Sequence, residues 1–197
     1  MQITGGFLKG QHLYTPSSKS KEIRPLRTRI RKALFDILGH NLEGKLVLDL
    51  FAGTGALGIE ALSRGAKLVV FVDLSPVSVE IIRKNLQKFK LEERAYIFRL
   101  QIPEEFPKLM KLMREHALTF DLVFITPPYE KGLALATLRK FPSALLKKEA
   151  LVMVEERSSV KLPGEVGPFH LKKQKIYGET TLYFYEPLGM DGQINPV

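Results

Sequence analysis

The stretch LVLDLFAGTGALGIEAL, from Leu46 to Leu62, decides the fold of this chain of 197 residues. It opens with an apolar run typical of a buried parallel strand, which ends at the charged Asp49. Gly53, Gly55 and Gly58 follow with the spacing G-x-G-x-x-G, and good helix formers come next. Strand, glycine turn and helix in this order predict a turn that binds a nucleotide, because glycine lets the backbone approach a ligand closely.

A second strand, from Lys67 to Val72, ends in another acid, Asp73. It follows the glycine turn at the spacing of about 20 residues at which dinucleotide sites place a carboxylate on the ribose hydroxyls. Two cofactors fit this pattern, a dinucleotide and S-adenosylmethionine. Asp49 favours the second, because its carboxylate would repel a pyrophosphate and attract the ammonium and sulfonium groups of S-adenosylmethionine. A glycine-rich turn that binds nothing is the alternative.

Composition excludes several classes of protein. The chain has no cysteine, which rules out disulfides, thiolate catalysis and cysteine metal sites, and its four histidines lack ligand spacing, so we expect no metal. No apolar run approaches the roughly 20 residues of a membrane span, and the N-terminus has no signal-peptide pattern. With 45% hydrophobic residues the chain can form the core of one α/β domain, and we expect a cytoplasmic protein.

The net charge of +9, from 30 basic and 21 acidic residues, favours a polyanionic partner. Residues 1–22 are predicted to form a basic, extended arm that contains Lys9. Residues 23–38 are predicted to form a helix with one apolar face, around which lie Arg24, Arg27, Arg31 and Lys32. We expect Lys9 and these four residues to bind the phosphates of a polyanion. A solvated amphipathic helix, with surface charge that serves solubility, is the alternative.

The rest of the sequence alternates strands with helices. Strands are predicted at 45–50, 68–72, 95–99, 120–125 and 150–155, and helices at 56–64, 77–89, 104–115 and 133–140. Two further strands, 169–177 and 180–186, are predicted to form an antiparallel hairpin around Gly178. The pattern indicates an α/β fold with a doubly wound, mainly parallel seven-stranded sheet, a C-terminal antiparallel hairpin and a small N-terminal arm. We expect an arm at 1–22, one domain at 23–190 and a frayed tail at 191–197.

The fourth strand ends in a second motif, Thr126-Pro127-Pro128-Tyr129. Consecutive prolines remove two amide donors and leave carbonyls that can accept hydrogen bonds, and an aromatic ring follows. In a doubly wound sheet this segment can neighbour the glycine turn. The chemistry it suggests is recognition of an exocyclic amine on a flat base, with the ring stacked on the base. A proline turn with a packing tyrosine is the alternative.

Together, Asp49 to Gly55 and Pro127-Pro128-Tyr129 resemble the amino-group methyltransferases that use S-adenosylmethionine. More narrowly, the chain resembles the bacterial RsmD family, which methylates a guanine exocyclic amine in small-subunit (16S) ribosomal RNA. The resemblance covers nearly the whole chain and is carried by residues 3–6, 9–10, 24–25, 31–35, 49–55, 58–66, 72–73, 85–86 and 127–129.

The resemblance implies a Rossmann-like methyltransferase fold and roles for named residues. The cofactor-binding residues it implies are Asp49, Phe51, Gly53, Gly55, Asp73, Leu74 and Gln101. The catalytic segment is Thr126, Pro127, Pro128 and Tyr129. The implied partner is ribosomal RNA or a small-subunit assembly particle, bound by a monomer, and the basic residues of the arm and helix would then be RNA-binding residues. This chain departs from the family pattern at Thr126, where an Asp is usual, at Leu26, where a Thr is common, and at Leu100-Gln101, where an Asp or Asn is usual.

Three other functions stay open from the sequence. Thr126 is compatible with a catalytically impaired RNA-binding relative of such an enzyme. The glycine spacing and Asp73 alone are compatible with a dinucleotide oxidoreductase. A DNA amino-methyltransferase shares the Pro-Pro-Tyr chemistry, but it would need a target-recognition segment for which this chain has little room.

Overall fold

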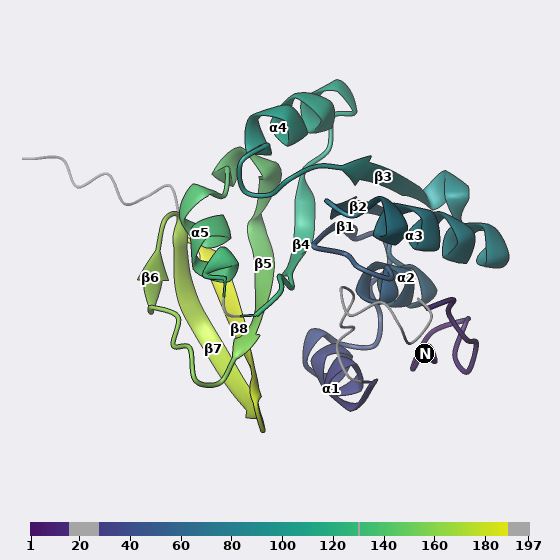
Figure 1. Cartoon of the computed structure of the whole chain (residues 1–197), viewed down its shortest axis with the longest axis horizontal. Coiled ribbons are helices and arrows are strands. Elements are labelled where there is room, and N and C mark those ends of the chain that lie inside the picture. The colour runs from purple at the N-terminus through teal and green to yellow at the C-terminus, as the bar shows by residue number, and fades with distance from the viewer. Residues whose placement is uncertain (16–27, 130, 189–197) are drawn as a thin grey trace, which may run out of the picture.

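The computed structural model describes residues 1–15, 28–129 and 131–188 (Figure 1). The predicted RNA-binding residues Arg24 and Arg27 lie outside the described residues. So do the end of the predicted arm, the start of the predicted basic helix and the predicted tail.

In the described part of the chain, one eight-stranded sheet has the order β3-β2-β1-β4-β5-β8-β7-β6 (Figure 1). The first five strands of the chain are parallel, β8 is antiparallel to β5, and β7 pairs antiparallel with β8 and β6. The strands are β1 Leu46–Leu50, β2 Leu68–Asp73, β3 Ala95–Arg99, β4 Phe120–Ile125, β5 Leu146–Arg157, β6 Glu165–Val166, β7 Phe169–Tyr177 and β8 Thr180–Pro187.

The predicted doubly wound, mainly parallel sheet is confirmed, and so is the hairpin of β7 and β8 around Gly178. The prediction of seven strands is one short, because β6 has only two residues, too few for a period-two pattern to appear in the sequence. β5 also continues to Arg157, beyond its predicted end at residue 155, since it pairs with β8 over that length.

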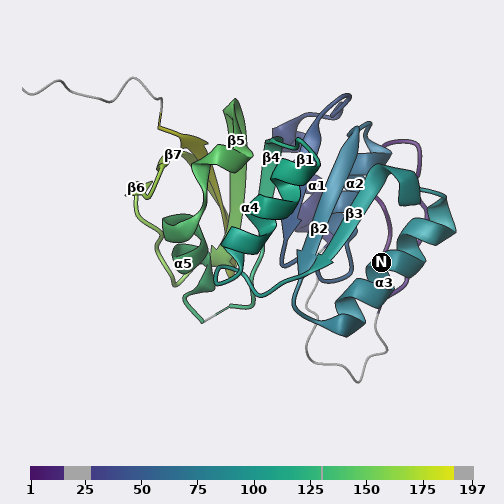
Figure 2. The same cartoon turned by 90° about the horizontal axis from the view of Figure 1, so that it is seen from above.

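Helices cover both faces of the sheet, as the view from above shows (Figure 2). They are α1 Thr28–Leu38, α2 Ala56–Ser63, α3 Pro76–Phe89, α4 Phe106–Glu115 and α5 Leu133–Lys140. Buried residues of α1, α2 and α3 form one core cluster with one face of the sheet, and those of α4 and α5 form a second with the other face. Because β1, β2 and β4 are covered on both faces, their sequences are nearly continuous apolar runs.

The first residues of the chain fold back on themselves and dock on α2. Gln2 and His12 form an antiparallel bridge. Ser63 of α2 then fixes the turn of the arm, because its Oγ donates to the Gly5 carbonyl at 2.7 Å and accepts from the Leu8 amide at 2.9 Å. The arm is therefore bound along the helix that follows the glycine turn.

The predicted RNA contact of Arg31 is wrong. Arg31 is fully buried between α1 and α2, where its Nε donates to Glu60 Oε2 at 2.8 Å. Glu60 also accepts hydrogen bonds from Arg64 and from Thr4 of the arm. Helical periodicity indicated a basic helix but could not show that a buried carboxylate on α2 lies opposite one of its arginines. A guanidinium neutralised inside the protein cannot reach an RNA phosphate.

Within the described residues, no helix is long and apolar enough to cross a membrane. The same parts of the chain hold no group of three or more His, Cys, Asp or Glu side chains that could bind a metal ion. In open α/β sheets, ligands bind beyond the carboxyl ends of the parallel strands, and a large cavity lies there in this protein.

Candidate functional site

A cavity of about 950 Å³ opens at the carboxyl ends of β1, β2 and β4. Four segments supply most of its lining: 51–54 after β1, 72–76 after β2, 99–102 after β3 and 126–129 after β4. Its volume lies within the range of about 300–1,000 Å³ that is typical of ligand pockets. The pairing of β1 with β4 brings the glycine turn and the Pro-Pro-Tyr segment together at one cavity.

The glycine turn has a backbone that few side chains allow. Phe51, Gly53 and Gly55 have positive φ angles of 60°, 57° and 75°. Phe51 and Gly53 line the cavity, whereas Gly55 is the residue at which α2 begins. Gly58 is required for packing, since a Cβ there would lie 2.2 Å from the Phe71 ring of β2. The first glycine thus opens the backbone to the cavity, and the third lets α2 pack closely on the sheet.

Asp73 uses its two carboxylate oxygens to hold two turns of the cavity wall. Oδ2 accepts from the Gly53 amide and Oδ1 from the Ser75 amide, each at 2.8 Å. Asp73 lines the cavity, and Ser75 is the N-cap of α3. A carboxylate offers about four acceptor positions, so that Asp73 can also accept from ribose hydroxyls. Its predicted contact with the ribose stays a prediction.

Asp49 lies beneath the glycine turn and is fully buried, outside the lining of the cavity. Its Oδ2 accepts from the Gly58 amide at 3.0 Å, and its Oδ1 has no hydrogen-bond partner among the described residues. Burial raises the pKa of Asp49 to about 7, the bond from Gly58 opposes this rise, and the charge of Asp73 adds to it. Asp49 is therefore poised to ionise when a cation is present nearby.

The wall of the cavity near the end of β3 combines apolar side chains with polar ones, which include Arg99 and Glu104. Leu100 and Ile102 are buried, Leu74 and Gln101 are exposed, and all four line the cavity. The apolar side chains here suit an adenine ring, whose exocyclic amine can donate to the carbonyl oxygen of the Gln101 side chain. The predicted roles of Leu74 and Gln101 fit this position and stay predictions.

These residues fit S-adenosylmethionine better than a dinucleotide. A buried carboxylate with one unpaired oxygen, together with the nearby carboxylate of Asp73, produces a negative potential at the glycine turn. Such a potential attracts an ammonium and a sulfonium and opposes a pyrophosphate. The glycine turn would hold the methionine end, Asp73 the ribose and the wall beyond β3 the adenine.

The Thr126-Pro127-Pro128-Tyr129 segment faces the glycine turn across β1 and β4. The Thr126 amide donates to the Leu50 carbonyl and its Oγ1 donates to the Phe51 carbonyl, each at a long 3.4 Å. Pro127 is buried and Pro128 exposed, and the whole segment lines the cavity. The predicted catalytic residues therefore lie beside the predicted cofactor residues, as the sequence required.

The cavity is also lined by residues that no sequence pattern predicted, among them Glu155, Arg157 and Thr180. The Tyr129 hydroxyl donates to Glu155 Oε1 and lies 3.0 Å from Thr180 Oγ1. One signal could have found Glu155: it is an acid at the end of an apolar run, like Asp49 and Asp73. Thr180 gives no such signal, because it reaches the cavity only through the antiparallel pairing of β8 with β5.

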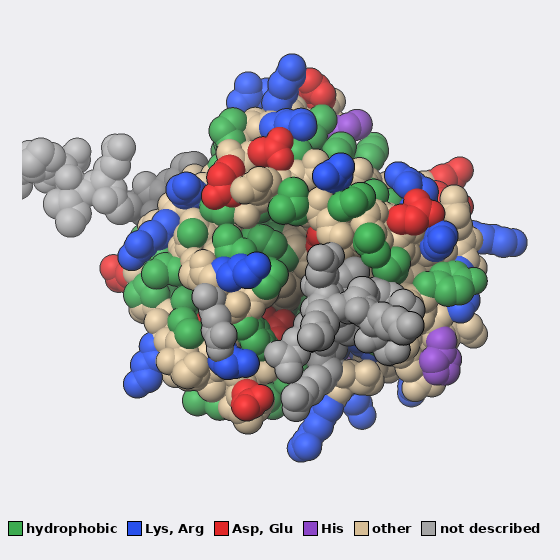
Figure 3. Space-filling model, viewed as in Figure 1, with side chains coloured by type: hydrophobic (Ala, Val, Ile, Leu, Met, Phe, Trp, Pro, Cys, Tyr) green, Lys and Arg blue, Asp and Glu red, His purple; other side chains and the backbone are tan. Residues whose placement is uncertain are grey.

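The described residues predicted to contact RNA are otherwise accessible. Lys9 of the arm and Lys32 of α1 are both exposed. The face of the molecule seen in Figure 3 is hollowed near its middle, and basic side chains lie around its edge. Their contacts with RNA stay predictions.

The sheet order, the glycine turn and the acids at the ends of β1 and β2 define a Rossmann-like methyltransferase fold. Residues 1–186 match the family described as conserved hypothetical protein 95. The ribosomal RNA small subunit methyltransferase D of Escherichia coli strain K12 is 28% identical over 187 residues, which cover 94% of this chain and 89% of that protein. The protein of the same name from Haemophilus influenzae is 32% identical over 190 residues, covering 94% and 93%. The chain belongs to this family, the RsmD-like methyltransferases that depend on S-adenosylmethionine.

Solved structures agree with the fold. The Escherichia coli protein yhhF matches with a TM-score of 0.77 at 28% identity, over 95% of this chain and 97% of that one. The Thermus thermophilus 16S rRNA N2 G1207 methyltransferase RsmC, solved with AdoMet and guanosine, matches with a TM-score of 0.64 at 24% identity, over 87% of this chain and 45% of that one. The second likeness shows the fold alone.

Proposed function

We propose that this protein transfers a methyl group from S-adenosylmethionine to the exocyclic N2 amine of a guanine in small-subunit (16S) ribosomal RNA. The observation that carries the proposal is a single cavity lined both by the glycine turn and by Thr126-Pro127-Pro128-Tyr129. The first suits a sulfonium cofactor, and the second suits a flat base with an exocyclic amine. A cofactor site and a base site that share one cavity are what a methyl transfer requires.

One group of residues in and around the cavity would bind the cofactor, and another would position the target base. S-adenosylmethionine would supply a methyl group on a sulfonium, whose methyl carbon an amine can attack with a neutral thioether as the leaving group. The cofactor would contact Phe51, Gly53, Asp73, Leu74 and Gln101, while Asp49 would act through its charge from beneath the glycine turn and Gly55 would shape that turn. The Pro127 carbonyl and Thr126 orient the amine, and the Tyr129 ring stacks on the base. Because the displacement needs an in-line approach, positioning by these residues contributes much of the rate.

The relatives support a ribosomal substrate. Two proteins named ribosomal RNA small subunit methyltransferase D align with nearly the full chain. We infer that the partner is ribosomal RNA or a small-subunit assembly particle and that the protein acts in the cytoplasm as a monomer. Residues 1–22 would serve as an arm and 23–190 as the methyltransferase domain, followed by a tail at 191–197.

Exposed lysines of β7 would make further contacts with RNA phosphates. Such contacts would add affinity without reading the RNA sequence. Lys173 and Lys175 are exposed, and they pair with Phe184 and Leu182 of β8. The next residue on that face, Tyr177, lines the cavity. The two lysines therefore extend from the border of the cavity along one face of the sheet.

The proposal is tested by methyl mapping. Small-subunit ribosomal RNA from cells that lack this protein is incubated, naked or as assembled particles, with the protein and isotope-labelled S-adenosylmethionine. Digestion to nucleosides and mass spectrometry should find label in N2-methylguanosine. Label in another nucleoside would contradict the proposed substrate, and label in duplex DNA in place of RNA would favour a DNA amino-methyltransferase.

One observation favours a second candidate, a catalytically impaired RNA-binding relative. Thr126 stands where the family usually has an Asp, so the segment lacks the charged acceptor at that position. Such a protein would bind S-adenosylmethionine and RNA in separate binding experiments, yet incorporate no label under any of the conditions above. Turnover with either substrate form rules it out.

A further inference from the structure

Glu155 brings a carboxylate into the cavity next to Thr126. Val154 is the last residue of β5 that pairs with β4, and its partner is Ile125. Glu155 and Thr126 each follow directly, so they lie beside each other where neighbouring strands run about 4.8 Å apart. The Glu155 side chain is 9% exposed and lines the cavity. It therefore lies at the base end of the cavity, separated from the Asp73 strand by β1 and β4.

The surroundings of Glu155 are polar and fixed by the sheet. Its Oε1 accepts from the Tyr129 hydroxyl, which also contacts Thr180. Arg157, two residues further along β5 and so on the same face, has its guanidinium 5.8 Å from the centre of the Tyr129 ring. Arg157 and Thr180 line the same cavity. An acceptor, a cationic donor, a hydroxyl and an aromatic ring thus meet at one place.

We propose that Glu155 recognises the target base by accepting hydrogen bonds from its N–H groups, and that this makes the site selective for guanine. The proposal rests on the proposed function and names the residue that chooses the base. A carboxylate has about four acceptor positions, so a contact with Tyr129 is compatible with bonds from a base.

The preference for guanine follows from the order of donors and acceptors on each base. Guanine presents N1–H and N2–H side by side, which matches the two oxygens of one carboxylate. Adenine and cytosine place a bare ring nitrogen beside their amine, and a carboxylate, which only accepts, is repelled by it. Arg157 supplies N–H donors that suit the O6 carbonyl of guanine, while the Tyr129 ring covers its face.

Glu155 also supplies a base for the proton that N2 loses, a role that Thr126 cannot fill. In the transfer, N2 forms a bond to the methyl carbon, the bond between that carbon and sulfur breaks with its electron pair left on sulfur, and N2 must lose one proton. A threonine hydroxyl is no useful base near neutral pH. The Glu155 carboxylate accepts the proton and releases it to water. The charged acceptor is thus supplied by β5 in place of the segment after β4.

The test compares Glu155→Gln with Glu156→Gln. Glu156 is the adjacent residue on β5, is 2% exposed, accepts from the Arg157 amide at 2.7 Å and lies outside the lining of the cavity. Binding of GMP, AMP and CMP is measured by calorimetry in the presence of S-adenosylhomocysteine. Glu155→Gln should weaken GMP binding on the order of tenfold to hundredfold, the loss expected for one bidentate contact, while Glu156→Gln changes little. S-adenosylhomocysteine should bind all three proteins equally.

Methyl transfer separates failure of this proposal from failure of the proposed function. If the unaltered protein methylates guanine in RNA and Glu155→Gln does so at the same kcat/KM, the role of Glu155 is overturned and the function stands. If GMP binding depends on Glu155 but no RNA is methylated, the base site stands and the function fails. Equal GMP affinity in the unaltered and Glu155→Gln proteins overturns the proposal.

A second variant tests whether a carboxylate is what the site needs. Thr126→Asp, added to the Glu155→Gln protein, places a carboxylate on the neighbouring strand end. It should recover on the order of tenfold in single-turnover transfer, which is the value of one charge-assisted bond over a neutral one. Recovery supports direct contact with the base, and no recovery in a folded protein would show that Glu155 acts only by holding Tyr129.

Discussion

Arg31 and Glu60 form an ion pair in which Nε lies 2.8 Å from Oε2 and both side chains are fully buried. Arg64 adds a second buried guanidinium, with its Nη2 2.8 Å from Glu60 Oε1. Desolvation lowers the pKa of Arg31 from its usual value, and the charge of Glu60 opposes this. The pair joins α1 to α2, and the Thr4 bonds to Glu60 bring the arm into the same network.

Arg31→Ala should therefore destabilise the fold. Arg64 still neutralises Glu60 in this variant, but the change removes the buried bonds from Arg31 to Glu60 and to the Gln2 carbonyl and leaves a cavity in place of a fully buried side chain. We expect the free energy of unfolding to fall by about 3 kcal/mol. Arg29→Ala, an exposed change on the same helix, should shift it by less than about 0.5 kcal/mol. Urea unfolding of both variants measures the difference. Equal values would show that Arg31 contributes no more than a surface arginine.

Asp73→Ala should abolish most cofactor affinity. The change removes the predicted ribose acceptor and frees the amides of Gly53 and Ser75, which hold the cavity wall. Loss of two bonds to a charged group predicts a fall on the order of hundredfold in affinity for S-adenosylhomocysteine. Asp36→Ala, at an exposed position of α1, is the matched control. Calorimetry that finds Asp73→Ala as tight as the control would refute the assignment.

The raised pKa of Asp49 predicts a pH-dependent affinity. Its pKa is about 7 in the folded protein, so the carboxylate is mostly neutral at pH 6 and mostly ionised at pH 8. If the cofactor ammonium needs the ionised form, the affinity for S-adenosylhomocysteine should rise about tenfold over this range, because the competent fraction rises by that factor. Asp49→Asn should bind weakly, with a flat profile. The same rise in both proteins would place the titrating group elsewhere.

The raised pKa of Asp49 also predicts how the stability of the fold changes with pH. Because the folded pKa lies above the ordinary value of 3.8, the folded protein binds more protons than the unfolded chain between these two pH values. The contribution of Asp49 to stability therefore falls as pH rises from about 4 to 7 and is constant above. Unfolding followed across this range should show a smaller decline for Asp49→Asn than for the unaltered protein. An identical decline in the two would count against the shift.

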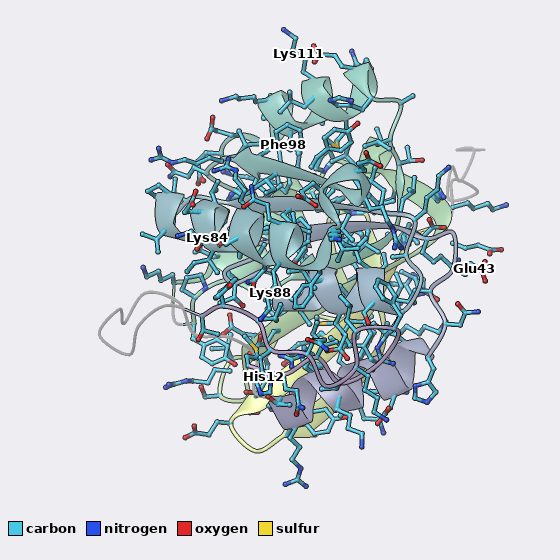
Figure 4. The ribbon with its side chains drawn as sticks, turned by 90° about the vertical axis from the view of Figure 1, so that its right-hand side faces the viewer. His12, Glu43, Lys84, Lys88, Phe98 and Lys111 are labelled. Carbon is cyan, nitrogen blue, oxygen red and sulfur yellow. The ribbon has the colours of Figure 1, made fainter. Side chains whose placement is uncertain are left out.

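Lys173→Ala combined with Lys175→Ala should weaken RNA binding mainly at low salt. Each lysine that contacts a phosphate contributes about 0.7–0.9 to the slope of log affinity against log salt, so losing two should lower it by roughly 1.5. The control pair, Lys84→Ala with Lys111→Ala, removes equal charge from α3 and α4, on the side shown in Figure 4. Filter binding at several salt concentrations measures both slopes. Equal slopes would mean that the β7 lysines do not contact RNA.

The sequence predicted the parallel core well, because β1, β2 and β4 are apolar runs covered on both faces, and β1 and β2 are followed by a glycine turn and by a helix cap. The run from Leu46 to Leu62 contains the strand, the turn and the helix without interruption, and Ser75 caps α3 where Pro76 begins it. Local patterns of this kind need no tertiary information. They also located the cofactor side of the cavity.

The base side of the cavity depends on pairings between distant segments. Thr180 lies near Tyr129 only because β8 runs antiparallel to β5, and no local pattern gives that register. The prediction for Arg31 was wrong for a related reason. Its partner Glu60 lies on another helix, and helical periodicity gives no information about contacts between helices. Side chains whose surroundings depend on pairing between distant segments were therefore the least predictable.

Beyond Val154, β5 has lost its pairing with β4 but continues its ladder with β8 as far as Arg157. The base end of the cavity is thus presented by a hydrogen-bonded strand, which holds side chains more rigidly than a loop does. Selectivity resides in side chains on a fixed backbone. In evolution or in engineering, this fold could exchange one target base for another through substitutions at residues 155 and 157, with no remodelling of the chain around them.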